Sequence, residues 1–374
     1  MTHLIFVHSS AELYGSDRSL RSICKVAADR GHRVTVIVPS DGPLVEALRA
    51  VGAEVTVGRV AVVRRATASP RGLIALARDM LSARELGKSL KSAADAIVIS
   101  NTSAVLSGLP MASALRAPHV FFVREYYKSS IERAVFNQVI RSSSLIVCVS
   151  NYVLTQFGES VRRKAVVIYS GGDLAASQPS PIDDRRSGPL RIVCVGRINA
   201  WKGQDVLIRA VAIARDSGTD IVLRVVGGEY GGSTEVTDHL HGLVEQLGLE
   251  ASVDFVGEVS DASEYMRWAD VVAVPSTRAE PFGKVVIEAM NQSRPVIATR
   301  GGGPAEVISD GIDGFLVEPG NEAELARTLE KAAVSIPTLR EMGLRGFTSA
   351  MAYDSRATST TAVEAIERTG SRNG

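Results

Sequence analysis

The chain has 374 residues, 45% of them hydrophobic and 22% charged, which predicts a globular protein with a sizeable core and about two domains. Its net charge of +1 argues against a dedicated nucleic-acid binder, so we expect no nucleic-acid partner. No apolar run approaches the roughly 18 residues of a membrane span.

Charge is distributed unevenly along the chain. Residues 1–180 carry 22 Lys and Arg against 13 Asp and Glu, whereas the remainder carries 20 against 28. A basic half joined to an acidic half predicts that the first half contacts something anionic, such as a membrane surface or a phosphorylated carrier. An uneven surface without such a partner explains the same counts, and both interpretations stay open.

The three cysteines, Cys24, Cys148 and Cys194, lie far apart in apolar segments. This pattern favours buried thiols in a reducing compartment, and the spacing is not that of metal ligands. The chain enters an apolar strand, HLIFVHSS, without the basic flank and cleavage site of a signal peptide. We therefore expect a cytoplasmic protein.

The first elements form one βαβ unit. LIFVHSS (4–10) predicts a strand, residues 17–30 a helix, and VTVIVP (34–39) the next strand. This order is typical of the doubly wound α/β class. Gly15 and Ser16 lie in the first loop, where backbone N–H groups can meet a phosphate; a plain turn is the alternative.

Strand and helix patterns alternate through the rest of the first half. Further strand signals lie in AIVIS (96–100), APHVFFVREYY (117–127), LIVCVS (145–150) and AVVIYSGGD (165–173). Arg124 and Glu125 follow the strand VFFV at its carboxyl end, where open α/β sheets bind ligands. A structural ion pair is the other interpretation of these two charges.

A predicted helix from about Pro70 to Ser92 mixes basic and apolar residues. Its basic residues are Arg71, Arg78, Arg84, Lys88 and Lys91. They could form a patch that contacts an anionic membrane, although a surface helix packed on its sheet explains the same pattern.

Residues 176–189 are rich in Ser, Pro and charge, have no apolar periodicity, and predict an interdomain linker. A second parallel sheet begins with LRIVCVG (190–196). Arg197 and Lys202 follow that strand, and two fixed cations at a strand–loop–helix junction suit a diphosphate. Taken singly, each is as well explained as a solvated loop cation.

The segment Pro275–Pro319 concentrates the most site chemistry. Glu280 lies in a loop, a helix begins near Lys284, and Glu288 follows eight residues after Glu280. Free N–H groups in the first turn of a helix form an anion site. GGG (301–303) lets a ligand approach the backbone closely. A surface αβ unit with solvated acids is the alternative.

These segments resemble a known family. VGRINAWKGQDVLIRA, FVGEVSDASEYMRWADVVAVPS and EPFGKVVIEAMNQSRPVIATRGGGPAEVISDGIDGFLVEP are similar to the retaining GT-B glycosyltransferases of family four, which include glycogen synthases, sucrose synthases and bacterial mannosyltransferases. The two acids with seven residues between them, Glu280 and Glu288, are the most specific part. HSSAELYGSDRSL, RGHRVTVIVP, IVCVSNYV and VIYSGGD resemble the acceptor domain less tightly.

The resemblance implies an α/β protein of two Rossmann-like domains facing across a cleft. We expect an acceptor domain over 1–178, a linker over 179–188 and a nucleotide-sugar domain over 189–355. The last helix, in 356–374, would cross back to the first domain.

The resemblance also implies roles for individual residues. Glu288 would hold the ribose hydroxyls, Glu280 the donor sugar, and Arg197 and Lys202 the departing diphosphate. Glu125 is included with these catalytic candidates. The other expected donor-binding residues are Gly15, Ser16, Gly196, Glu258, Val259, Phe282, Gly283, Lys284 and Val285. The expected partners are a nucleotide sugar and a sugar or lipid-linked acceptor, in polysaccharide or glycolipid synthesis.

Neither a cofactor nor a metal is expected. The chain has no Asp-x-Asp pair, and His239 and His241 are two apart on a predicted helix and share no face. Two residues depart from the family pattern. Arg124 stands where a His is usual, and Gly15-Ser16 replaces a Gly-Gly.

Other functions remain open from the sequence. An epimerase or phosphorylase shares the fold, although no pyridoxal lysine motif is recognisable. A non-catalytic nucleotide-binding module or an oxidoreductase is a third class. No Gly-x-Gly-x-x-Gly follows the first strand or the strand at 190–196, which counts against a dinucleotide.

Overall fold

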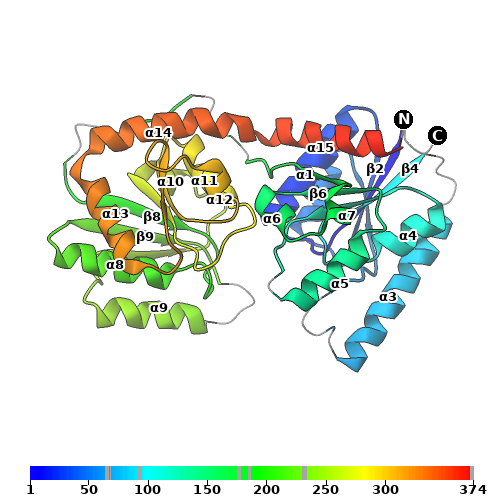
Figure 1. Ribbon diagram of the computed structural model, residues 1–374, viewed down its shortest axis with the longest axis horizontal. Coiled ribbons are helices and arrows are strands. Elements are labelled where there is room, and N and C mark those ends of the chain that lie inside the picture. Colours follow the sequence, from blue (N-terminus) through cyan, green and yellow to red (C-terminus); the bar gives the residue numbers. More distant parts are fainter. Residues whose placement is uncertain are drawn as a thin grey trace. The chain divides into compact units, whose positions relative to one another are not determined.

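A computed structural model describes residues 1–63, 67, 69–90, 95–127, 129–172, 174, 178–183, 187–229 and 234–370. The chain divides into two compact units. Unit 1 comprises Met1–Gly171 and Ser355–Gly374, and unit 2 comprises Gly172–Asp354. Each is a parallel sheet covered by helices, and the last helix belongs to unit 1 (Figure 1). The predicted class of two Rossmann-like domains is confirmed.

Unit 1 contains a seven-stranded parallel sheet in the order β3-β2-β1-β4-β5-β6-β7. Its strands are β1 (His3–Val7), β2 (Arg33–Val38), β3 (Glu54–Val57), β4 (Ala96–Ser100), β5 (His119–Val123), β6 (Leu145–Cys148) and β7 (Ala165–Val167). The order reverses direction between β1 and β4. Ligands of doubly wound sheets bind at such a switch point.

The helices of unit 1 cover both faces of this sheet. They are α1 (Gly15–Asp29), α2 (Pro43–Arg49), α3 (Pro70–Ser89), α4 (Gly108–Leu115), α5 (Ser130–Ile140), α6 (Asn151–Thr155), α7 (Glu159–Arg162) and α15 (Ser355–Gly370). Leu4 and Phe6 of β1 point into a core with α1, α2 and α15, whereas Ile5 and Val7 face the core of α3 and α4. Both faces are apolar because a parallel strand is buried on both sides.

Unit 2 repeats the plan with six parallel strands in the order β10-β9-β8-β11-β12-β13. They are β8 (Leu190–Val195), β9 (Ile221–Val226), β10 (Val253–Gly257), β11 (Val271–Val274), β12 (Val296–Thr299) and β13 (Gly314–Val317). The switch point lies between β8 and β11.

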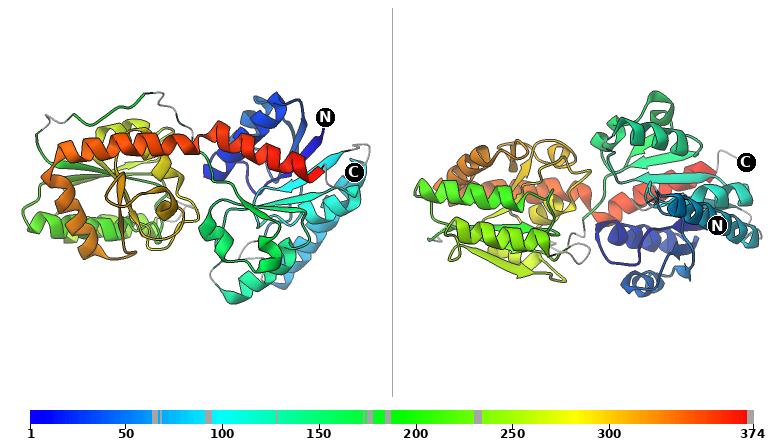
Figure 2. Two further views of the ribbon diagram at one scale, coloured as in Figure 1. Left: turned by 45° about the horizontal axis from the view of Figure 1, so that its top comes forward. Right: turned by 90° about the horizontal axis from the view of Figure 1, so that it is seen from below.

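The helices of unit 2 are α8 (Gln204–Asp216), α9 (Glu235–Gln246), α10 (Ser263–Trp268), α11 (Lys284–Asn291), α12 (Pro304–Val307), α13 (Glu322–Val334) and α14 (Ile336–Ala350), followed by the 3-10 turn η2 (Met351–Tyr353). Helices α8, α9 and α13 pack on one face of the sheet, and α10 and α11 lie on the other (Figures 1 and 2).

The predicted linker differs from the structure. The chain passes between the units at Gly171–Gly172 rather than within 179–188, and the described part of that segment belongs to unit 2. Ile182 is 2% exposed in the core of unit 2, and Ser180 N donates to Ser293 Oγ over 3.0 Å. The Ser/Pro-rich composition correctly indicates an irregular segment. The buried Ile182 side chain and the Ser180–Ser293 hydrogen bond nevertheless hold this segment to unit 2. Residues 184–186 lie outside the described residues.

The three thiols are all buried and unpaired by disulfides, as the sequence predicts. Burial raises the pKa of Cys148 and Cys194 to about 12, so these thiols stay protonated and unreactive near neutral pH.

A buried histidine at the start of β5 makes the stability of unit 1 depend on pH. His119 lies 3.1 Å from Ser100 Oγ and 2.8 Å from Ser143 Oγ, and burial lowers its pKa to about 3. The unfolded chain protonates this ring below about pH 6.5 while the folded chain does not. Stability is therefore complete above that pH and falls by about 1.4 kcal/mol per pH unit as the pH drops further towards 3.

We expect His119→Asn to remove this contribution. Urea unfolding at pH 7.5 and pH 5.0 should show a smaller loss of stability in the variant than in the wild type, by about 2 kcal/mol. The matched control is His32→Asn. The His32 ring is partly exposed and lies against Glu367. Equal pH dependence in wild type and His119→Asn would contradict a buried neutral ring.

Candidate active site

The switch point of unit 2 brings together two loops that are far apart in the sequence. One follows β8 and contains Gly196, Arg197 and Lys202; the other follows β11 and contains Ser276 and Glu280. Because both strands end at the same edge of the sheet, their polar side chains meet there.

Glu280 and Lys202 form a direct ion pair at this point. Lys202 Nζ lies 2.7 Å from Glu280 Oε1, and Ser276 Oγ donates to the same oxygen. The exposed fractions of the two side chains are 6% for Glu280 and 16% for Lys202. A pair shielded from water in this way has a fixed geometry and a strong local field. The family resemblance assigns Glu280 to the donor sugar and Lys202 to the diphosphate, and it does not identify Ser276 as a site residue.

Glycines allow the loops to come this close. Gly203 has a φ of +73°, and a Cβ at this residue would lie 2.0 Å from Pro275 O, in the loop after β11. Gly302 has a φ of +70°, and its Cβ would lie 2.1 Å from Glu280 O. Gly303 N donates to that same carbonyl over 2.8 Å. The backbone around Glu280 is therefore fixed from two sides.

Glu280 also lies close to the N-terminal end of α11. Gly283 precedes this helix with a φ of +78°, and Glu280 Oε2 would lie 3.4 Å from a Cβ there. Lys284 and Val285 form the first turn, and the half-buried Glu288 lies on the next turn. The helix begins where the sequence predicts. Its N-terminal N–H groups and partial positive charge favour an anion at this end.

The other predicted donor residues lie along the same edge of the sheet. Gly196 directly follows β8 and has a φ of +151°. The next residue, Arg197, is half-buried. Glu258 and Val259 follow β10, and the Glu258 carboxylate would lie 2.9 Å from a Cβ at Gly228, next to β9. Phe282 is 4% exposed, and its ring packs 6.1 Å from that of Tyr353.

In unit 1, Gly15 and Ser16 do not lie in a loop. They form the first turn of α1, which begins two residues before the predicted start. Asp17 Oδ2 accepts a hydrogen bond from Tyr14 N over 2.8 Å, and this contact starts the helix early. Both residues remain at a helix N-terminus, the position that favours an anion.

A buried network that sequence reasoning missed lies at the switch point of unit 1. His8 follows β1 and Asn101 follows β4, and both are fully buried. His8 Nε2 lies 2.6 Å from Asp17 Oδ1, and its Nδ1 lies 3.1 Å from Asn101 Nδ2. Burial acts to raise the pKa of Asp17, but hydrogen bonds from His8, Ser10 and Tyr14 outweigh it and lower that pKa. Polar residues directly after two buried strands were the available signal.

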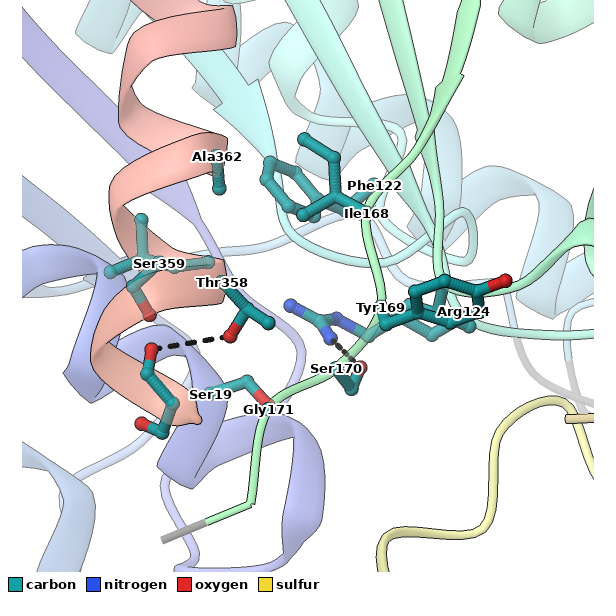
Figure 3. Close-up of a pocket in the computed structure, with 13 residues that line it drawn as sticks. Ser19, Phe122, Arg124, Ile168, Tyr169, Ser170, Gly171, Thr358, Ser359 and Ala362 are labelled. Carbon is teal, nitrogen blue, oxygen red and sulfur yellow. Dashed lines mark hydrogen bonds between the residues drawn. The ribbon is translucent and has the colours of Figure 1, made fainter. Parts of the chain in front are cut away.

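Arg124 and Glu125 do not pair with each other through their side chains as an isolated ion pair. Arg124 Nη1 donates to Ser170 Oγ over 3.1 Å (Figure 3). Its other nitrogens donate to Asn101. Glu125 Oε2 accepts from Ser103 Oγ and from Arg124 N. The predicted residues thus form two sets, a larger one in unit 2 and a smaller one in unit 1.

No helix in the described part of the chain is both long and apolar enough to cross a membrane. Among the same residues, no three His, Cys, Asp or Glu side chains gather as metal ligands would.

Two doubly wound parallel units, each with polar side chains at its switch point, define the GT-B class of glycosyltransferase folds. Solved structures agree. The UDP complex of HepE from Anabaena superposes with a TM-score of 0.82 at 24% identity, over 98% of this chain and 100% of that one. A glycosyltransferase from Rickettsia africae gives a TM-score of 0.81 at 20% identity, over 98% of both chains.

Sequence comparison gives the family. The profile described as Glycosyl transferases group 1 matches residues 180–344, and the profile of Glycosyltransferase Family 4 matches residues 14–176. The chain belongs to the group 1, family 4 glycosyltransferases. The D-inositol 3-phosphate glycosyltransferase of Actinosynnema mirum is 36% identical over 190 residues, which are 48% of this chain and 45% of that protein. The chain thus spans about half the length of the curated relatives it matches.

Proposed function

We propose that the protein transfers a sugar from a nucleoside diphosphate sugar to a hydroxyl acceptor, with retention of anomeric configuration and without a metal. The observation that carries this proposal is the Lys202–Glu280 pair at the switch point of unit 2, close to the N-terminus of α11 and on the same loop as Arg197. Fixed cations and a helix N-terminus suit a diphosphate, and a fixed carboxylate suits sugar hydroxyls.

The chemistry follows from this arrangement of charge. As the glycosidic bond breaks, positive charge develops at the anomeric carbon and negative charge on the departing diphosphate. Arg197 and Lys202 would stabilise the second of these, since preorganised charges lower a barrier most where charge develops. The departing phosphate would take the acceptor proton on the same face, so no protein nucleophile is required.

The remaining donor contacts would come from residues near the carboxyl ends of the strands of unit 2. Glu288 on α11 would hold the ribose hydroxyls. The backbone of Phe282, Gly283, Lys284 and Val285 would contact the sugar and phosphates, Gly196 would allow close approach, and the backbone at Glu258 and Val259 would border the base. In unit 1, Gly15 and Ser16 at the N-terminus of α1 would offer N–H groups to an anion.

Names of similar proteins guide the choice of substrates. The HepE structures include complexes with UDP-glucose and with UDP and glucose, so UDP-glucose is the first donor to test. Several curated relatives are named D-inositol 3-phosphate glycosyltransferases, so a polyol and its phosphate ester are acceptors to compare, and we propose a role in envelope polysaccharide or glycolipid synthesis.

The test is product analysis by NMR with UDP-, GDP- and ADP-sugars, with and without EDTA. We expect one donor to give an axial or equatorial product that matches its own anomeric configuration, at an unchanged rate in EDTA. Inversion, or activity that EDTA abolishes, would contradict the proposed mechanism. An epimerase would change the donor without transfer, and a non-catalytic module would bind the nucleotide and leave the donor intact.

We also propose that unit 1 contacts an anionic membrane on its cytoplasmic side. On α3, Leu73, Ile74 and Leu81 are 56%, 70% and 63% exposed, and Ala83 and Gly87 are its only buried residues. Arg71, Arg78, Arg84 and Lys88 are exposed around them, whereas Lys91 lies outside the described residues. Exposed aliphatic side chains among cations suit the interface of an anionic bilayer.

We expect Ile74→Glu with Leu81→Glu to lower binding to vesicles of phosphatidylglycerol and phosphatidylcholine at least tenfold, because each buried aliphatic side chain contributes about 1.5–3 kcal/mol. Co-sedimentation measures this binding. Val334→Glu, on an 85% exposed residue of unit 2, is the control. Wild-type protein that stays in the supernatant would contradict membrane contact.

A further inference from the structure

The ends of β4 and β5 in unit 1 hold an arginine that the protein already engages, a carboxylate that it engages in part, and half-buried tyrosine rings. These strands end next to the switch point, which is the place for a ligand of unit 1. Their chemistry therefore bears on which acceptor this unit can accept.

Arg124 is committed to the protein. Its Nε donates to Asn101 O over 3.0 Å, and its Nη2 to Asn101 Oδ1 over 3.1 Å. These two N–H groups form the fork that would otherwise bind a phosphate with two parallel bonds. The third nitrogen, Nη1, donates to Ser170 (Figure 3). Burial lowers the pKa of Arg124 to about 10, which still leaves it charged near neutral pH but fixed in place.

Glu125 is held on one side only. Its Oε2 accepts from Ser103 Oγ, from Arg124 N over 3.1 Å and from Ser103 N over 3.4 Å. Ser103 is fully buried, so these contacts fix the position of Oε2. Among the residues that the structure describes, none donates to Oε1. The half-buried carboxylate thus keeps one oxygen for a further donor.

The neighbouring aromatic residues add a second unmet group. The hydroxyl of Tyr127 is buried and has no hydrogen-bond partner in the described part of the chain. Burial, and then the charge of Glu125, raises the pKa of Tyr127, whereas the nearby Ser103 hydroxyl, outside normal hydrogen-bond geometry, acts to lower it; the Tyr127 hydroxyl stays protonated. The ring of Tyr126 stacks on that of Tyr152 with centroids 4.3 Å apart. Buried polar groups without partners in a folded protein call for a ligand or a water.

We propose that Glu125 binds a hydroxyl group of the acceptor, and that the acceptor is a neutral sugar or polyol rather than a phosphate ester. This inference rests on the proposed transfer function and names its acceptor class. It assigns to Arg124 a positioning role: Arg124 holds the ends of β4 and β5 and the segment at Ser170 together and does not bind the acceptor as an anion site.

The selectivity has a physical basis. A hydroxyl that donates to an ionised carboxylate forms a bond roughly twice as strong as one between neutral groups. A phosphate offers only acceptors and charge to Glu125, so it would be repelled by a group that cannot move away. Sites built around a specific hydrogen bond reject ligands that cannot form it by several orders of magnitude.

The experiment measures transfer from the active donor to glucose, mannose and myo-inositol, each paired with its monophosphate ester. We expect at least one neutral member to be an acceptor, with kcat/KM at least tenfold above that of its ester. Glu125→Gln should raise KM for this acceptor about tenfold and leave KM for the donor unchanged. Ser103→Ala, which keeps the charge but loosens the carboxylate, should raise it about threefold.

Glu85→Gln, a change of an exposed acid on α3, is the matched control and should alter neither constant. Melting temperatures of all variants identify folding damage. Equal or better transfer to the phosphate esters overturns the inference, as does donor cleavage by water with no transfer to any neutral member. Absence of both donor binding and donor cleavage would instead overturn the proposed function itself.

Discussion

Replacement of Glu280 by Gln should lower kcat by about 10²–10³-fold while nucleoside diphosphate binding persists. Gln has the same shape, so Ser276 and the backbone at Gly302 and Gly303 can hold it as they hold Glu280. It lacks the charge that Lys202 faces at 2.7 Å. Loss of this charged bond should also cost about 2 kcal/mol of folding stability. Steady-state product formation measures kcat, titration calorimetry with UDP measures nucleotide binding, and urea unfolding measures stability.

Glu322→Gln, at the exposed start of α13, controls for a simple change of charge on unit 2. Wild-type turnover by Glu280→Gln would remove Glu280 from the catalytic set. Parallel loss of turnover, UDP binding and melting temperature would show that the carboxylate is needed for folding rather than for transfer.

Gly302→Ala should destabilise the protein by about 2–5 kcal/mol and abolish donor binding. The new Cβ would lie 2.1 Å from Glu280 O and 2.8 Å from Glu280 N, and the residue has a φ of +70°. Two costs therefore add: a left-handed backbone for Ala and displacement of the backbone that carries Glu280. Urea unfolding and UDP titration measure the outcome.

Gly311→Ala separates these two costs. Gly311 has a φ of +76°, and a Cβ there would meet no atom within 4 Å. We expect this variant to lose about 1–2 kcal/mol from the backbone alone and to bind UDP normally. Equal destabilisation by the two variants would mean that contact with Glu280 contributes nothing.

Much of the fold was predictable because buried parallel strands are short apolar runs between helical patterns. The start of α11 at Lys284 was predictable too, since Pro281 and Gly283 interrupt the chain just before an apolar helix pattern. The boundaries of irregular segments were not predictable. Ile182 shows that one apolar residue in a Ser/Pro-rich run can enter a core, and nothing in the local pattern signals it.

The candidate site was predictable in its residue types but not in its contacts. Lys202 and Glu280 are 78 residues apart, and only the pairing of β8 with β11 makes them neighbours. The network around His8 and Asp17 was missed because, taken singly, His8 resembles an ordinary loop residue and Asp17 an ordinary acid at a helix start. Likewise, the sequence places Arg124 at a strand end but cannot show that Asn101 occupies its fork.

The two units use the same position for different chemistry. In unit 2, Lys202 and Glu280 meet at the switch point. In unit 1, His8 contacts both Asn101 and Asp17 there. We infer that unit 2 provides the charges for the donor and that unit 1 provides neutral and acidic hydrogen-bonding groups for the acceptor.

The most direct measurement of the central claim is the melting temperature of the protein with UDP, GDP and ADP. A ligand that binds only the folded state raises stability by about 2.7 kcal/mol at a hundred times its Kd. We predict that at least one diphosphate raises the melting temperature of the wild type and that Arg197→Met with Lys202→Met abolishes the shift. No shift with any diphosphate, or an equal shift in the double variant, would contradict a diphosphate site at the switch point of unit 2.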